Sequence, residues 1–377
     1  MTVPGSHELR RIVSRAEALA RAGEPAVLAT LVRLRGSHYR KPGARMLLGG
    51  GELAGMVSGG CLDAELSARA AGALAAGRPV ALVYDLTRED DALWGFGLGC
   101  AGEVTLLLEP LAGGGASPLA GVAHALAARR RLAMATLFAS PEDGPPPGLR
   151  RWRDSAGEEG GDALPAALRG PLEAALDAVL AGGGAAEVAA PDGSWAALVE
   201  PLEPPVSLVV AGAGRDAVPA AELAARLGWE ISVVDPQGKP ETAERFPDAE
   251  AVLGPPLGGL GARLRLGPRA AAVVMTHRYL DDLALLAELL PLPFGYLALL
   301  GPRSRRERLL ADLERRGLAA ADAARARIRN PAGLDLGGGS PEEIALAIVA
   351  EAQAALQGRS GGPLTARAER EAAAAPA

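Results

Sequence analysis

The sequence predicts an α/β protein of two domains: a mixed α+β domain, then a Rossmann-like doubly wound parallel sheet. Three observations support this. The chain has 377 residues, more than a usual single domain. The run EPLEPP over 200–205 has the composition of a short stiff linker. Directly after it, a β-branched run, a glycine turn, a helical run and a second β-branched run form a βαβ unit.

We therefore expect an N-terminal domain over 1–200, a linker over 201–205 and a Rossmann-like domain over 206–358. The last residues, 359–377, are expected to be a disordered tail. We find no internal repeat in the sequence.

Composition excludes several classes of protein. The formal net charge of −6 argues against a nucleic-acid binder, whose surface is basic. No apolar run reaches the roughly 18 residues of a membrane span, and the N-terminus lacks the apolar region of a signal peptide. Two cysteines in so long a chain do not form a secreted disulfide framework. A cytoplasmic protein is the expectation.

The first domain is predicted to alternate helices and strands. A helix over 7–22 has an apolar stripe, and the strand AVLATLVRLRG follows it. The basic loop GSHYRKPGARM leads into a hairpin around Gly49–Gly51. The helix after it ends at Gly77, which suits a C-terminal cap. The other elements expected are strands VALVYDL, EVTLLLEPL and LAMATLFAS, helices near 118–130 and 165–181, exposed loops at PEDGPPPG and DSAGEEGGD, and a hairpin through WAALVEPLEP.

The second domain carries a nucleotide-binding fingerprint. GAGRDA follows a strand and opens a helix, as that motif requires. Gly212 allows the tight turn, and Gly214 lets the backbone approach a pyrophosphate. Asp235 ends the next strand, where an acid suits a ribose hydroxyl and favours NAD over NADP. The alternative is that these glycines serve helix–strand packing in a scaffold that binds no dinucleotide.

Further elements of this domain end in polar groups. The strands AAAVVMTH and FGYLALLG are followed by His277 and by Arg303, positions where open α/β sheets hold ligands. His277 is a candidate acid or base, or a plain loop histidine. Arg303 is a candidate anion ligand, or part of a solvated basic face. A final helix begins at Ser340 with a capping box.

The two cysteines, Cys61 and Cys100, both lie between glycines. A cytoplasmic disulfide is disfavoured, and zinc would need further ligands from only four histidines. A buried, inert thiol is the simplest alternative. For Cys61 the preceding Gly59 and Gly60 argue against it, because they open the backbone before a helix start that lowers the pKa of a thiol.

The succession of motifs over roughly 8–358 resembles the xanthine dehydrogenase accessory family, the XdhC/CoxI-type proteins. The matching stretches include RLRGSHYRKPGARML, GMVSGGCLDAEL, WGFGLGCAGEVTLLLEPL, LVVAGAGRDAVP, VVMTHRYLDDLALL and LLGPRSRRERL. The resemblance implies an XdhC/CoxI-type first domain and a Rossmann-like second domain. It also implies a maturation factor that binds the molybdenum cofactor. Such a factor delivers the sulfurated cofactor to a xanthine dehydrogenase-type molybdenum hydroxylase, alongside a cysteine-desulfurase-type sulfur donor.

Under this resemblance, Cys61 would contact molybdenum or its sulfur, since thiolates are soft metal ligands, with Cys100 near it. Arg40 and Arg45 would hold the phosphate of the cofactor. The protein would be a chaperone without turnover of its own, and family members are often homodimers. The alternatives are an NAD(P)-dependent oxidoreductase that uses His277, and a nucleotide-binding adaptor.

Overall fold

The computed structural model describes residues 5–85, 102–111, 117–318 and 321–366. The chain divides into two compact units, Met1–Pro204 and Pro205–Ala377. The division falls inside the segment predicted as a linker, although Pro201 and Leu202 are the last residues of a strand. In the described part of the chain, no helix combines the length and apolar character needed to cross a membrane.

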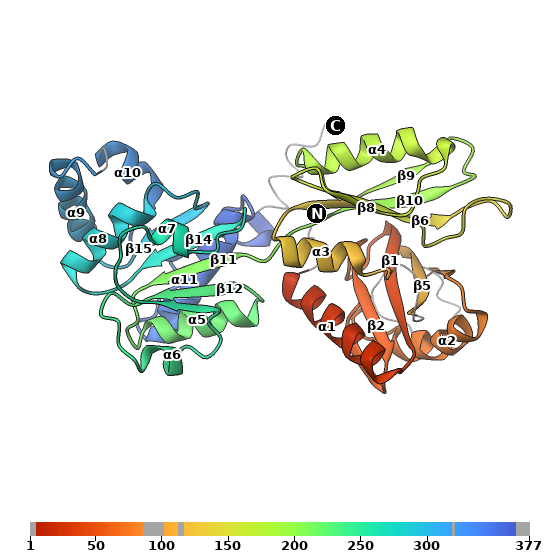
Figure 1. Cartoon of the computed structure of the whole chain (residues 1–377), viewed down its shortest axis with the longest axis horizontal. Coiled ribbons are helices and arrows are strands. Elements are labelled where there is room, and N and C mark those ends of the chain that lie inside the picture. The colour runs from red at the N-terminus through yellow and green to blue at the C-terminus, as the bar shows by residue number, and fades with distance from the viewer. Residues whose placement is uncertain (1–4, 86–101, 112–116, 319–320, 367–377) are drawn as a thin grey trace. The chain divides into compact units, whose positions relative to one another are not determined.

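The first unit contains two five-stranded antiparallel sheets, which we call sheet A and sheet B. Sheet A has the strand order β3-β2-β1-β5-β4, and sheet B has the order β8-β7-β6-β10-β9. Figure 1 labels β1, β2 and β5 of sheet A and β6, β8, β9 and β10 of sheet B. The elements around sheet A are α1 (Ser6–Ala22), β1 (Ala26–Gly36), β2 (Arg45–Gly49), β3 (Glu52–Gly55), α2 (Asp63–Ala76), β4 (Val80–Asp85) and β5 (Gly102–Leu111). Those around sheet B are α3 (Ala120–Ala128), β6 (Leu132–Ala139), β7 (Arg150–Asp154), β8 (Glu159–Gly161), α4 (Ala166–Leu180), β9 (Ala186–Ala189) and β10 (Ala196–Leu202).

These two sets of elements are an internal structural repeat. Each half, 6–111 and 120–202, runs helix, three strands, helix, two strands, with the same spatial strand order. Even the register agrees, because Thr30 pairs with Arg45 in one half and Thr136 pairs with Arg150 in the other. The absence of a repeat predicted from the sequence is therefore wrong. We call the halves the first and second repeat.

The core of the first unit is layered. Helix α2 covers the outer face of sheet A, and α4 covers the outer face of sheet B. Between the sheets, α1 and α3 share one apolar cluster with both inner faces, which includes Ile12, Leu28, Val122 and Trp152. Strands β7 and β8 overlap the run DSAGEEGGD, which was wrongly predicted to be only an exposed loop.

The second unit has a six-stranded parallel sheet of order β13-β12-β11-β14-β15-β16. This order is the doubly wound arrangement, so the predicted Rossmann-like fold is confirmed. Its strands are β11 (Ser207–Ala211), β12 (Glu230–Val234), β13 (Ala251–Leu253), β14 (Ala270–Val274), β15 (Tyr296–Leu299) and β16 (Ile328–Arg329). Its helices are α5 (Ala217–Arg226), α6 (Thr242–Arg245), α7 (Leu260–Arg263), α8 (Tyr279–Leu289), α9 (Arg303–Arg315), α10 (Ala321–Arg327) and α11 (Pro341–Leu356).

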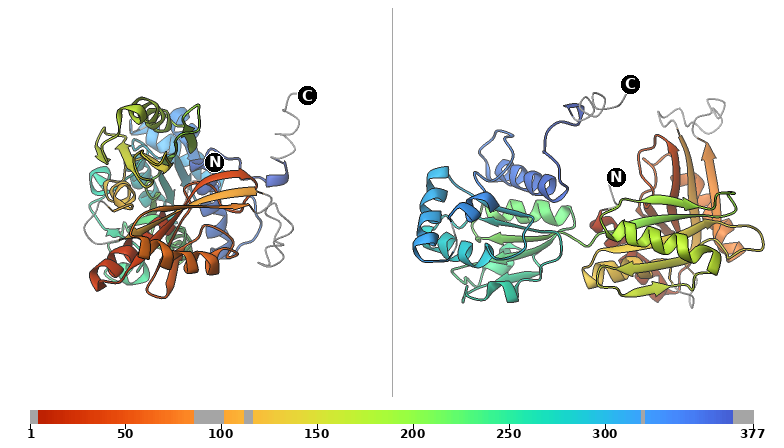
Figure 2. Two further views of the ribbon diagram at one scale, coloured as in Figure 1. Left: turned by 90° about the vertical axis from the view of Figure 1, so that its right-hand side faces the viewer. Right: turned by 90° about the horizontal axis from the view of Figure 1, so that it is seen from above.

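Helices cover both faces of this sheet. Helices α7 to α10 pack on one apolar cluster, and α5 packs beside α11 on the other (Figure 2). The start of α11 confirms the predicted capping box. The Ser340 side chain accepts a hydrogen bond from the Glu343 N–H, and the Glu343 carboxylate accepts one from the Ser340 N–H.

Candidate functional site

The topology of sheet A brings the predicted first-domain residues to one end of the sheet. Strands β1, β3 and β4 end there, while β2 and β5 begin there, as the antiparallel registers show. The basic loop 37–44, which contains Arg40, and the cysteine loop 56–62, which contains Gly59, Gly60 and Cys61, both leave from this end. We call it the cysteine end of sheet A. Cys100 lies outside the described residues.

The cysteine loop is built around a buried serine. The Ser58 hydroxyl accepts hydrogen bonds from the N–H groups of Gly60 at 3.1 Å and Leu62 at 3.3 Å. Gly60 has φ +105°, which favours glycine, and a Cβ at either Gly59 or Gly60 would meet no atom of the described residues within 4 Å. The described residues therefore leave open space directly before the thiol.

Cys61 is a free cysteine that stands two residues before α2. Its side chain is half-buried against the cluster between α2 and sheet A, where Leu34 and Tyr84 also pack. Burial raises the pKa of Tyr84, and the Glu65 carboxylate on α2 raises it further. The thiol is therefore neither fully buried nor fully exposed, and it packs against an apolar cluster.

Arg40 is bonded to a carboxylate that the sequence analysis did not identify. Its guanidinium lies 2.5 Å from Glu8 of α1, and the other Glu8 oxygen accepts the Met56 N–H at 3.0 Å. Glu8 therefore ties the basic loop to the start of the cysteine loop. The neighbouring Lys41 is exposed. No local pattern marks Glu8, because its partners lie more than thirty residues away along the chain.

Arg45 does not reach the surface. Its side chain is fully buried, lies 2.5 Å from Glu200 of β10, and donates to the Gly43 carbonyl oxygen at 2.7 Å. A phosphate could contact this guanidinium only by displacing Glu200 from the core. The structure places Arg45 in the packing between the two sheets, apart from the exposed part of the basic loop.

His38 is the other buried polar group of the basic loop. Its Nδ1 lies 3.2 Å from the Arg40 backbone nitrogen, and Nε2 has no hydrogen-bond partner in the described part of the chain. Burial lowers the pKa of His38, and the charge of Lys41 also lowers it. The hydrogen bond with the Arg40 backbone acts the other way, and the net effect favours the neutral ring.

An apolar cavity lies at the opposite end of sheet A. Its lining includes Val13 and Ala16 of α1, Leu111 of β5 and Gly77, which follows α2. None of the predicted site residues lines it, so the largely apolar cavity and the cysteine loop are separate features of the unit.

In the second unit, two residues predicted from the sequence, Gly212 and His277, lie where the strand order reverses. Gly212 follows β11, and a Cβ there would lie 2.6 Å from the Met275 carbonyl oxygen beyond β14, so only glycine fits. Four residues later, Asp216 directly precedes α5, and its carboxylate is 2.7 Å from His277 Nε2. This His–Asp contact lies at the ligand side of a doubly wound sheet.

Two other residues were predicted to contact a nucleotide. Asp235 is bound within the chain, and Arg303 is exposed. The Asp235 carboxylate is buried and accepts hydrogen bonds from the N–H groups of Gln237 and Lys239, each at 2.9 Å, and from the Thr242 hydroxyl at 2.7 Å. Burial acts to raise the pKa of Asp235, but these donors outweigh it and the pKa is lowered. Arg303 is exposed at the first residue of α9.

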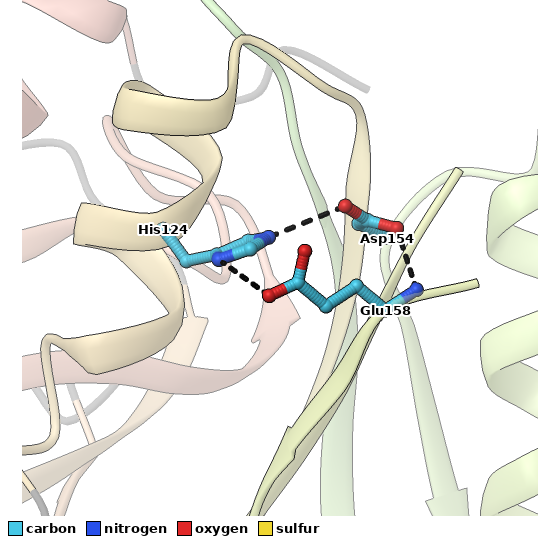
Figure 3. Close-up of side chains that lie close together, drawn as sticks. All are labelled: His124, Asp154 and Glu158. Atoms are coloured by element: carbon cyan, nitrogen blue, oxygen red, sulfur yellow. Dashed lines mark hydrogen bonds and ion pairs between the residues drawn. The ribbon is translucent and has the colours of Figure 1, made fainter. Parts of the chain in front are cut away.

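A histidine and two carboxylates also gather in the second repeat, at the β7–β8 turn (Figure 3). His124 of α3 lies 3.2 Å from Asp154 and 3.8 Å from Glu158. The Arg130 guanidinium lies 3.1 Å from Asp154 and 3.6 Å from Glu158. Because this guanidinium already stands where a cation would balance both carboxylates, we interpret the cluster as an ion-pair network that closes the turn.

Comparisons with known proteins cover most of the chain. One family model, the XdhC and CoxI family, matches 19–85, and another, the XdhC Rossmann domain, matches 208–352, so together they span more than half of the chain. A protein of Bacillus subtilis (strain 168) described as a probable xanthine dehydrogenase subunit is 29% identical over 350 residues, 89% of this chain and 94% of that protein.

Two further relatives extend the comparison. The molybdenum cofactor insertion chaperone PaoD of Escherichia coli (strain K12) is 36% identical over 110 residues, 29% of this chain and 33% of that protein. The crystal structure of a xanthine dehydrogenase from Bacillus halodurans superposes with a TM-score of 0.72 at 27% identity. It covers 92% of this chain and 96% of that chain.

Proposed function

Because the chain belongs to the XdhC and CoxI family, we propose that it is an accessory protein that binds the molybdenum cofactor and helps deliver its sulfurated form to a molybdenum hydroxylase. The hydroxylase would be of the xanthine dehydrogenase type, and a cysteine-desulfurase-type protein would supply the sulfur. Similarity to a cofactor insertion chaperone and to a probable xanthine dehydrogenase subunit supports this proposal.

The observation that carries the proposal is the half-exposed thiol of Cys61 at the cysteine end of sheet A. A thiolate is a soft ligand that suits a metal–sulfur group. No described residue beyond the chain neighbours would touch a Cβ on Gly59 or Gly60, which leaves room for a ligand next to the thiol. The bound cofactor would supply the molybdenum chemistry, and Cys61 would hold its metal or sulfur. The buried face of α2 would keep water away from one side of the thiol.

The phosphate of the cofactor fits a revised set of cations. Arg45 is buried on Glu200, so we assign the phosphate to Lys41, which is exposed, and to Arg40. Arg40 would then exchange the Glu8 carboxylate for the phosphate, a charge-assisted contact of the same kind. Since Glu8 also holds the Met56 N–H, this exchange would loosen the cysteine loop and couple phosphate binding to the position of Cys61.

An oxidoreductase that uses His277 is the second candidate, favoured by the doubly wound sheet and the His277–Asp216 contact. It is weaker, because the Asp235 carboxylate that would hold the ribose is committed to three internal donors.

The test is Cys61→Ala, expressed in a host that makes the cofactor and purified without oxygen. Removing a group that only orients a metal ligand typically costs about tenfold or more. Since Cys61 would touch the metal or its sulfur directly, we expect the pterin content and the activation of the target hydroxylase to fall at least about tenfold. A matched control is Cys61→Ala/Ser67→Cys, which restores a thiol on the exposed face of α2. Unchanged pterin content in Cys61→Ala, or full recovery in the control, would refute the assignment.

A further inference from the structure

The nucleotide fingerprint of the second unit contains an acidic residue, Asp216, at the end of its glycine turn. In such fingerprints the second glycine lets the backbone approach a pyrophosphate, which then lies at the N-terminus of the following helix. Here the helix is α5, which begins at Ala217, and the second glycine is Gly214.

The space that Gly214 leaves is filled from within the chain. A Cβ on Gly214 would lie 2.4 Å from the Asp216 Oδ1 atom, and among the described residues beyond its chain neighbours only the carboxylate of Asp216 comes within 4 Å of it. The carboxylate therefore folds back over the glycine, on the side where a diphosphate would pass. It also places a negative charge at the positive end of the α5 dipole, where the anion of a ligand would otherwise lie.

His277 holds the carboxylate in this position. Its Nε2 lies 2.7 Å from Asp216 Oδ2, while Oδ1 lies beside Gly214. The backbone of His277 has φ +59°, a left-handed conformation that few residues other than glycine adopt. Such strain is kept where the surroundings specify it, and here it turns the imidazole from β14 toward the loop after β11.

We infer that Asp216 is a specificity-determining residue that closes this fingerprint to diphosphate-bridged dinucleotides. Its carboxylate repels a diphosphate and occupies its path, and His277 keeps it there. Asp235, the residue that would bind the ribose of a dinucleotide, supports the same inference. Its carboxylate already accepts hydrogen bonds from three groups of the chain. In this chain the second unit retains the dinucleotide-type fold while its two acidic contact residues bind the protein itself.

The experiment is a titration of the full chain with NADH, followed by nicotinamide fluorescence. Asp216→Ala removes both the charge and the obstruction, so it should bind NADH at least about tenfold more tightly than the wild-type chain. Asp216→Asn removes only the charge and should show a smaller gain. His277→Ala frees the carboxylate but keeps its charge, so its gain should be the smallest of the three.

A matched control is Glu222→Gln, which removes one negative charge from the exposed side of the same helix. It should leave NADH binding unchanged. Equal binding by wild type, Asp216→Ala and Asp216→Asn would overturn the inference, as would a gain in Glu222→Gln as large as in Asp216→Ala. Asp216 makes no side-chain cap to α5, so these variants should fold, and thermal melts confirm it. The outcome is independent of the Cys61 test, which reads pterin content.

Discussion

The two repeats of the first unit share a framework and differ in their connections. Each repeat places an arginine at the start of its second strand and a glutamate in its fifth strand, and each arginine pairs with the glutamate of the other repeat. Arg45 bonds Glu200, and Arg150 bonds Glu109, in both cases at 2.5 Å within the core. Even the preceding glycines correspond, since Gly43 and Gly148 both have φ +96° and give their carbonyl oxygens to these arginines.

The differences lie in the loops. The first repeat contains both cysteines of the chain and the basic loop, whereas the second has neither. Where the first repeat opens α2 with the Ser58–Cys61 loop, the second opens α4 after Pro165. The duplicated strands and ion pairs therefore maintain the fold, and the proposed function rests on the connections that only one repeat carries.

The largest expected effect tests whether the ion pairs are equivalent. Arg45→Met leaves Glu200 buried without its partner, and Arg150→Met does the same to Glu109. Removing one partner of a buried pair destabilises a protein by about 3–5 kcal/mol. We expect both variants to lose stability in this range, measured as the shift of the urea unfolding midpoint.

Two controls sharpen this comparison. Arg69→Met breaks an exposed pair with Glu65 and should leave the free energy of unfolding almost unchanged. The double variant Arg45→Met/Glu200→Leu removes both charges and should regain most of the loss. If the free energies of unfolding of Arg45→Met and Arg150→Met differed by as much as the loss expected for either variant, the two ion pairs would not be equivalent contacts.

A smaller effect separates the cysteine loop from the framework. Gly60→Ala forces a residue with a Cβ into φ +105° and should cost about 1–2 kcal/mol, whereas Gly59→Ala, where φ is not left-handed, should change stability little. Thermal melts compare the two. Since Gly60 directly precedes Cys61, Gly60→Ala should also lower pterin content more than Gly59→Ala. Equal behaviour of the two variants would show that the loop geometry does not position the thiol.

The sequence predicts the second unit far better than the first for a physical reason. A βαβ unit is local, so the glycine turn, the helix and Asp235 appear within about thirty residues of one another. The first unit is antiparallel and duplicated, and its register depends on pairs far apart along the chain. Its repeat leaves only short traces, such as ATL at 29–31 and 135–137, and EPL at 109–111 and 200–202. Loops of different length separate these traces.

The candidate site shows the same limit. Gly60 and Cys61 are recognisable because a glycine run before a helix is a local pattern. The assignment of Arg45 to a surface phosphate site rested on its place in a basic run, while its partner Glu200 lies 155 residues away. Glu8 and Asp216 could not be identified as internal partners of Arg40 and His277 for the same reason. Sequence patterns identify which groups are charged, and tertiary contacts decide which of them are already bound.

The smallest expected effect concerns the turn between the second and third strands of each repeat. In the first repeat this turn joins Gly49 to Glu52, and in the second it joins Asp154 to Glu158. Burial acts to raise the pKa of Asp154, but hydrogen bonds from the Glu158 N–H, Arg130, His124 and the Ala156 N–H outweigh it and lower the pKa to about 2. A lowered pKa gives stability that is present above the ordinary value of about 3.8 and is lost as pH falls toward 2.

Asp154→Asn should therefore destabilise the chain by about 1 kcal/mol at pH 7, and by progressively less below pH 4. Glu52→Gln alters the exposed Arg15 pair of the first repeat and should have little effect at either pH. Urea unfolding at pH 7 and pH 3 measures both. If the loss of free energy of unfolding in Asp154→Asn were as large at pH 3 as at pH 7, packing and not the charge of Asp154 would distinguish the second turn from the first.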